Sequence, residues 1–161
     1  MKPFIPAALL AYQFGLTARG LGANLEGISD EEGRRRPPQG GNSINWVVGH
    51  IVSYRRVVLE LLGEQPTWPK ERTEAYGRGS SGDARGDQIL PLAQLMEDLQ
   101  ATTAAIVKRL EALPDGALET PGPNPKQTLG QHLAFLSFHE SYHAGQVGLL
   151  RRLAGKPGAI R

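Results

Sequence analysis

The sequence contains no cysteine among its 161 residues. This absence excludes disulfide bonds, thiolate metal ligands and a cysteine nucleophile. No stretch approaches the roughly 18 consecutive apolar residues that a membrane-spanning helix requires, and the N-terminal residues lack the apolar segment of a signal peptide. We therefore expect a cytoplasmic protein that has no membrane partner.

The sequence also has little excess charge of one sign. Its formal net charge is +2, too small for a strong field that would attract nucleic acid or an acidic lipid surface. The two basic runs, residues 34–36 and 151–152, are not interleaved with aromatic residues as nucleic-acid surfaces usually are. We predict that both runs are solvated surface and that the protein has no nucleic-acid partner.

The remaining composition is typical of a globular protein, with 40% hydrophobic and 21% charged residues. The length suits one domain, and we expect residues 1–161 to form it. Apolar residues recur with helical spacing in four segments that Gly- and Pro-rich stretches separate. The predicted helices cover about residues 6–27, 43–62, 89–113 and 128–154. In the first helix we expect an apolar face formed by Leu9, Leu10, Leu16, Leu21 and Leu25.

Several helix starts carry a local signature. Ser29 with Glu32, and Thr128 with Gln131, match the capping box, in which the first and fourth residues cap the helix reciprocally. The first of these boxes predicts a short helical turn. Ser43 is the expected start of the second long helix.

Residues 64–88 are rich in Gly, Pro, Ser and charge. This segment is much longer than the tight turn that joins antiparallel neighbours in a bundle. The sequence therefore predicts an all-α fold, a four-helix bundle with a long crossover connection between its second and third helices.

Three of the four histidines form a pattern that suits a metal site. His139 and His143 are four residues apart on one predicted helix, which places both imidazoles on one face. His50 lies in the apolar stretch of another helix, from which it can meet them inside the bundle. Two other interpretations stay open on the residues alone: a hydrogen-bonded core histidine at His50, and a surface pair on the last helix.

The fourth histidine and a neighbouring glutamate do not extend this pattern. His132 lies about two turns, or roughly 10 Å, before His139, too far to share one ion with His143. Residues 139–143 also match the H-E-x-x-H motif of zinc proteases, but residues 144–161 contain no His, Asp or Glu as third ligand. Glu140 points about 100° away from His139, so we expect it at the surface or between helices.

Two stretches resemble the DinB-like (YfiT-like) family of metal-dependent bundle proteins. They are SINWVVGHI at residues 43–51, and TLGQ at 128–131 followed by HESYHAGQV at 139–147. The resemblance implies that His50, His139 and His143 are the metal ligands, and that the bundle forms a homodimer. The family commonly has a basic residue where Ala144 stands here, and any role of that position is in doubt.

Three histidine ligands leave coordination positions open, as in catalytic metal sites. Imidazole suits zinc, nickel, iron or copper, and we expect one divalent ion, with zinc or nickel first. Since some members of the resembled family use low-molecular-weight thiols, we expect an S-transferase acting on a small electrophile in a stress response. A metal-dependent hydrolase and a non-catalytic metal-binding module remain alternatives.

The sequence also predicts the surroundings of several residues near the expected ligands. Gly145 and Gly148 lie inside a helix, which predicts that another segment approaches them closely. Gln146 either supports a ligand or faces solvent. The aromatic residues Trp46, Tyr54 and Tyr142 are better explained as core than as the lining of a pocket.

Overall fold

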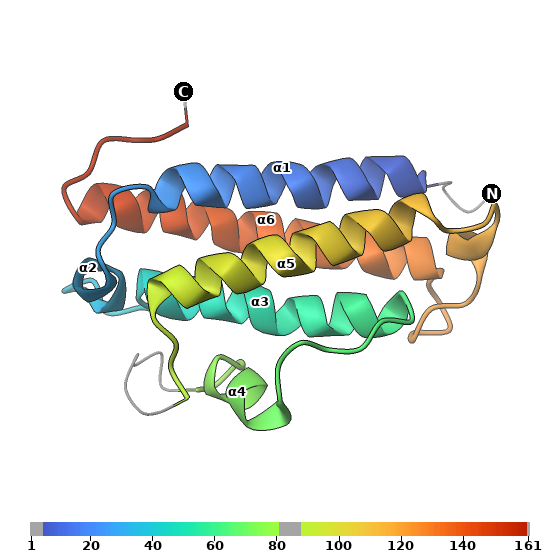
Figure 1. Ribbon diagram of the computed structural model, residues 1–161, viewed down its shortest axis with the longest axis horizontal. Helices are drawn as coiled ribbons and strands as arrows, with labels where there is room; N and C mark the ends of the chain where they lie inside the picture. The colour runs from blue at the N-terminus through green and yellow to red at the C-terminus, as the bar shows by residue number, and fades with distance from the viewer. Residues whose placement is uncertain (1–4, 81–87, 161) are drawn as a thin grey trace.

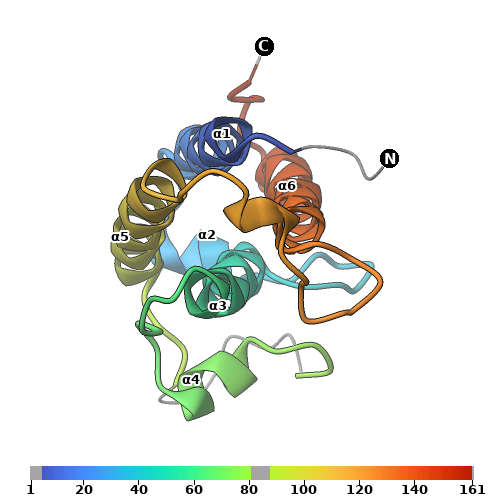
Figure 2. The ribbon, with the colours of Figure 1, turned by 90° about the vertical axis from the view of Figure 1, so that its right-hand side faces the viewer.

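Four long α-helices form the body of the computed structural model, which describes residues 5–80 and 88–160. They are α1 (Ala7–Leu25), α3 (Ile44–Leu61), α5 (Leu92–Glu111) and α6 (Leu129–Leu153). Seen along their length, they form a ring in which α1 and α3 each contact both α5 and α6 (Figure 2). No β-strand occurs within the described ranges. The predicted all-α four-helix bundle is thus confirmed.

The helix directions explain the long connection. α1 and α6 run one way along the bundle, whereas α3 and α5 run the other way (Figure 1). Because α3 and α5 are parallel neighbours, the chain must return along the whole bundle between them. The predicted crossover is therefore present, although its residues 81–87 lie outside the described part.

Local capping chemistry places the helix starts. Ser43 precedes α3 and its hydroxyl accepts a hydrogen bond from the Trp46 amide at 3.1 Å. Both predicted capping boxes form, at the start of the short helix α2 (Asp30–Arg34) and at the start of α6. These bonds satisfy amide donors that have no partner within the helix.

The connection between α3 and α5 is more ordered than its Gly-rich composition indicates. It contains a short helix, α4 (Lys70–Ala75), which the sequence did not predict. Trp68 and Tyr76 on either side of α4 are buried, and Trp68 Nε1 donates to Asp98 Oδ2 of α5 at 2.7 Å. The two aromatic residues therefore attach the connection to the bundle.

Two apolar clusters form the core. The cluster nearer α2 and α4 includes Leu21, Leu25, Val47, Val48, Ile51, Leu95, Leu99 and Val147. The other lies toward the 3₁₀-helix η1 (Ala117–Glu119) and includes Leu10, Phe14, Val58, Leu59, Ile106, Leu110, Leu133 and Leu136. Along α3, the buried Arg55 separates the residues of the two clusters.

The prediction for the apolar face of α1 was partly wrong. Leu10, Leu21 and Leu25 are buried, but Leu9 is 48% exposed and Leu16 is 50% exposed. The cause is that α1 carries apolar residues around most of its circumference, so spacing alone did not identify the inward face.

The prediction that residues 151–152 are solvated surface was wrong for Arg151. Its side chain is buried, because its guanidinium donates to the carbonyl oxygens of Asn24 and Glu26 at the C-terminal end of α1 and of Pro157.

No helix in the described part of the chain is both long enough and apolar enough to cross a membrane.

Candidate metal centre

The three predicted histidines meet between α3 and α6. One ring nitrogen from each of His50, His139 and His143 lies within 4.8 Å of the other two. The Nε2 atoms of His139 and His143 are 3.2 Å apart. A zinc ion bound at about 2.0–2.1 Å by two nitrogens at a tetrahedral angle separates them by about 3.3 Å. The spacing of His139 and His143 thus fits one divalent ion directly, and His50 lies close enough to be the third ligand.

Two of the imidazoles are oriented through their other nitrogen. His50 Nδ1 donates to the backbone carbonyl oxygen of Tyr76 at 2.7 Å, and His143 Nδ1 bonds Gln146 Oε1 at 2.8 Å. A proton on each Nδ1 leaves the Nε2 lone pair available, as metal-binding histidines require. Of the two interpretations of Gln146, the geometry favours support of a ligand.

A close contact between Tyr76 and Gly49 places the Tyr76 carbonyl beside His50. The Tyr76 ring lies against the backbone of Gly49, where a Cβ would overlap the ring. The Tyr76 hydroxyl donates to Asn45 Oδ1 at 3.3 Å and accepts from the Leu90 amide at 2.8 Å. Glycine at position 49 therefore allows the crossover to lie directly on α3 beside the first histidine.

The electrostatic environment keeps two of the imidazoles neutral. Burial, with the nearby His143 and His50, lowers the pKa of His139 from 6.5 to about 4. Burial also lowers the pKa of His50, against the opposing effect of its bond to the Tyr76 carbonyl. Neutral imidazole is the form that binds metal, so both residues are ready to bind near pH 7.

Aromatic rings surround the cluster and line a cavity of about 650 Å³ that the histidines also face. Trp46 is stacked on His50, with ring centroids 4.7 Å apart and an interplanar angle of 13°. The Tyr54 ring centroid is 4.4 Å from that of His139, and the Tyr142 centroid is 5.3 Å from that of His143. All three line the cavity. Trp46 is also part of the buried core and Tyr54 packs against it, as expected, whereas the expectation was wrong for Tyr142, which is 58% exposed.

The other residues considered in the sequence have different surroundings. His132 is not part of the cluster, and its ring contacts Phe135 instead. Glu140 is buried between the helices and paired with Arg55, so its carboxylate is not free to act as the general base of a zinc protease. No atom outside the local helix lies within 4 Å of a Cβ built at Gly145, so the predicted close approach there was wrong.

The fold and the histidine cluster define a helical-bundle protein with a candidate three-histidine metal site. Residues 13–147 match the DinB superfamily, and the chain belongs to this superfamily. Among solved structures, a conserved protein from Enterococcus faecalis is similar, with a TM-score of 0.73 and 17% identity over 96% of this chain and 100% of that chain. At this identity the likeness concerns the fold alone. No curated protein matches the sequence.

Proposed function

We propose that His50, His139 and His143 hold one divalent ion, zinc or nickel, and that the site performs thiol-dependent S-transfer to a small electrophile. The observation that carries this proposal is the convergence of three imidazole nitrogens on the wall of a cavity of about 650 Å³. Cavities of about 300–1,000 Å³ accommodate small-molecule ligands. A site with room beside the ion suits a catalytic role better than a closed structural one.

A bound divalent ion with open coordination positions supplies a Lewis acid that lowers the pKa of a coordinated thiol or water. The chain's own residues determine how the rest of the site behaves. Three neutral imidazoles leave the positive charge of the ion uncompensated, which favours an anionic ligand. The rings of Trp46, Tyr54 and Tyr142 provide an apolar wall for the carbon skeleton of an electrophile and reduce the access of water.

The cavity lining favours thiol transfer over hydrolysis. None of the described lining residues is acidic, and the nearby carboxylate of Glu140 is engaged with Arg55. Hydrolysis usually depends on a positioned general base, whereas a thiol is acidic enough to ionise beside a cation without one. Because the chain has no cysteine, the thiol must come from solution.

A single cationic side chain in the cavity lining indicates which charge the thiol carries. Arg78, on the connection after α4, is the one Lys or Arg among the described lining residues. Together with the uncompensated charge of the ion, it favours a thiol that carries a carboxylate.

We include a homodimer in the proposal. Exposed apolar side chains follow the outer faces of α1 and α6, which are neighbours in the bundle. They are Leu9, Tyr12, Leu16, Phe138, Leu149 and Leu153, each exposed by 48% or more. An apolar surface over two adjacent helices is typical of an interface, and a second copy of the chain is the occupant we propose.

Cobalt-substituted protein tests the chemistry, because a thiolate bound to cobalt(II) produces a charge-transfer absorption band. We expect the band with N-acetylcysteine, a weaker response with the uncharged 2-mercaptoethanol, and none with N-acetylserine as control. Arg78→Met should reduce the preference for the anionic thiol while keeping the band, because the charge of the ion remains. A spectrum that no thiol changes would reject thiol chemistry, and thiol-independent ester hydrolysis by the zinc protein would support the hydrolase alternative.

A further inference from the structure

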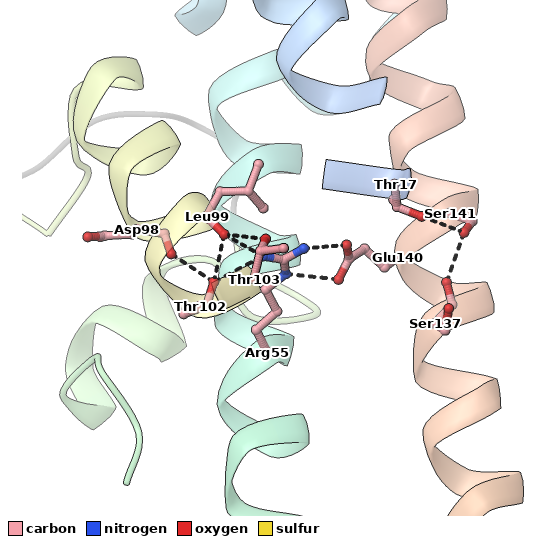
Figure 3. A network of polar contacts seen from close by, with 9 residues as sticks. All are labelled: Thr17, Arg55, Asp98, Leu99, Thr102, Thr103, Ser137, Glu140 and Ser141. Carbon is pink, nitrogen blue, oxygen red and sulfur yellow. Dashed lines mark hydrogen bonds and ion pairs between the residues drawn. The ribbon is translucent and has the colours of Figure 1, made fainter. Parts of the chain in front are cut away.

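A buried ion pair joins α3 to α6 beside the histidine cluster. The fully buried Arg55 donates from Nε to Glu140 Oε2 at 2.9 Å and from Nη2 to Glu140 Oε1 at 2.6 Å. Its Nη1 donates to the Leu99 carbonyl oxygen at 2.5 Å and to Thr103 Oγ1 at 2.6 Å, both on α5. Figure 3 shows the guanidinium between the Glu140 carboxylate and these α5 acceptors. One side chain therefore connects three of the four long helices.

The pair lies on the same two helices as the three histidines. Glu140 directly follows His139 on α6, and Arg55 comes five residues after His50 on α3. Neighbouring residues lie about 100° apart around the helix axis, and they move together when the helix rotates as a unit. A rotation or a slide of α6 that displaced Glu140 from Arg55 would therefore displace His139 and His143 from His50 as well.

Apolar burial alone specifies the orientation of α6 poorly. Leu136 and Val147 are buried in the bundle, yet Phe138 and Leu149 are 66% and 60% exposed on the opposite side of the helix. A rotated α6 would still present apolar side chains to the core. It would, however, leave the Arg55 guanidinium buried without its counter-ion, which is strongly unfavourable.

We infer that Arg55 and Glu140 are positioning residues, which set the rotation and register of α6 on α3 and so bring His139 and His143 to His50. The consequence for metal binding rests on the proposed function, whereas the orientation of α6 does not. A buried ion pair adds little net stability relative to well-packed apolar residues of similar volume. Its contribution here is the selection of one helix orientation.

A double variant separates orientation from stability. Arg55→Met/Glu140→Met removes both charges together, so that neither is left buried alone, and it roughly conserves volume. The matched control is Leu110→Met/Leu133→Met. It substitutes two buried residues of the apolar cluster that lies toward η1, and it leaves the ion pair intact. Circular dichroism and urea unfolding establish that both variants fold.

Two measurements then compare these proteins. The first is the cobalt(II) dissociation constant. The second is the distance distribution between spin labels at Glu60→Cys on α3 and Gly145→Cys on α6, both exposed positions in a chain without other cysteines. For Arg55→Met/Glu140→Met we expect cobalt binding at least about tenfold weaker and a broadened or second distance. The control should keep one narrow distance and wild-type affinity.

The two measurements test different parts of the inference. An unchanged distance distribution in Arg55→Met/Glu140→Met overturns the inference, whatever the cobalt affinity. A changed distance with wild-type cobalt affinity refutes the link to the histidines. If the wild-type chain binds no cobalt, the proposed function fails, and the distance measurement alone decides whether the ion pair orients α6.

Discussion

The ring of Tyr76 lies directly on the backbone of Gly49, the residue that precedes the first histidine of the cluster. This contact places the Tyr76 carbonyl oxygen 2.7 Å from His50 Nδ1. The crossover between α3 and α5 thus does more than connect two helices, because its carbonyl occupies His50 Nδ1 and leaves Nε2 available as the ligand atom.

Gly49→Ala should disturb the site and the fold together. The new methyl group overlaps the Tyr76 ring, so that ring and its carbonyl must move away from His50. We expect a loss of about 1–3 kcal/mol in the free energy of unfolding, as for other overpacked cores, and weaker metal binding. Urea unfolding and a competition titration with a chelating indicator measure the two effects.

Gly145→Ala is the matched control for this substitution. It lies within α6, and no atom outside the local helix is within 4 Å of the added Cβ. Alanine there should stabilise the helix by about 0.5–1 kcal/mol and leave metal affinity unchanged. Equal effects of the two substitutions would contradict the role assigned to the Tyr76 contact.

Gln146→Leu should weaken metal binding without a large loss of stability. Gln146 Oε1 bonds His143 Nδ1 at 2.8 Å, and loss of such a partner typically lowers metal affinity about 10–100-fold. Gln146→Glu retains an oxygen acceptor and should restore affinity. If all three proteins bind zinc equally in a competition titration, Gln146 does not orient the ligand.

The metal-free protein should lose stability as the pH falls from about 6.5 toward 4. Burial lowers the pKa of His139 to about 4 in the folded chain, and the pKa of His50 moves in the same direction. Within that interval the unfolded chain binds protons that the folded chain does not, so the free energy of unfolding rises with pH. Urea unfolding at several pH values should show a shallower dependence for His139→Gln. An identical dependence would argue against this burial effect.

Phe138→Glu should convert a dimer into a monomer. Phe138 is 66% exposed on the outer face of α6, so a charge there opposes an apolar interface but costs the isolated bundle little. Gln100→Glu adds the same charge at an exposed position of α5 and is the control. Light scattering coupled to size-exclusion chromatography gives the masses, and a monomeric wild-type protein would refute the dimer.

Much of the fold could be predicted because its signals are local. The capping box of Thr128 and Gln131 lies within one helical turn, and it forms as expected. The four-residue spacing of His139 and His143 likewise determines that both side chains share a face. The place of His50 opposite them followed from its apolar surroundings and from the resemblance to the DinB-like family.

The features that the sequence did not reveal depend on contacts between distant segments. Arg55 and Glu140 are 85 residues apart, and the one hint was an arginine within the apolar stretch of α3. Tyr76 lies in a segment whose composition indicates only a loop, and its carbonyl bond to His50 depends on tertiary packing. The exposure of Leu9 and Leu16 could not be predicted either, because apolar residues occur on several faces of α1.

The metal content of the untagged protein tests the central claim most directly. Plasma mass spectrometry, after incubation with zinc or nickel and removal of unbound metal, should compare the wild-type chain with His139→Ala/His143→Ala. We predict about one ion per wild-type chain and none in the double variant, with both proteins folded by circular dichroism. A wild-type chain that retains neither metal, or a double variant that retains as much as the wild type, would contradict the three-histidine site.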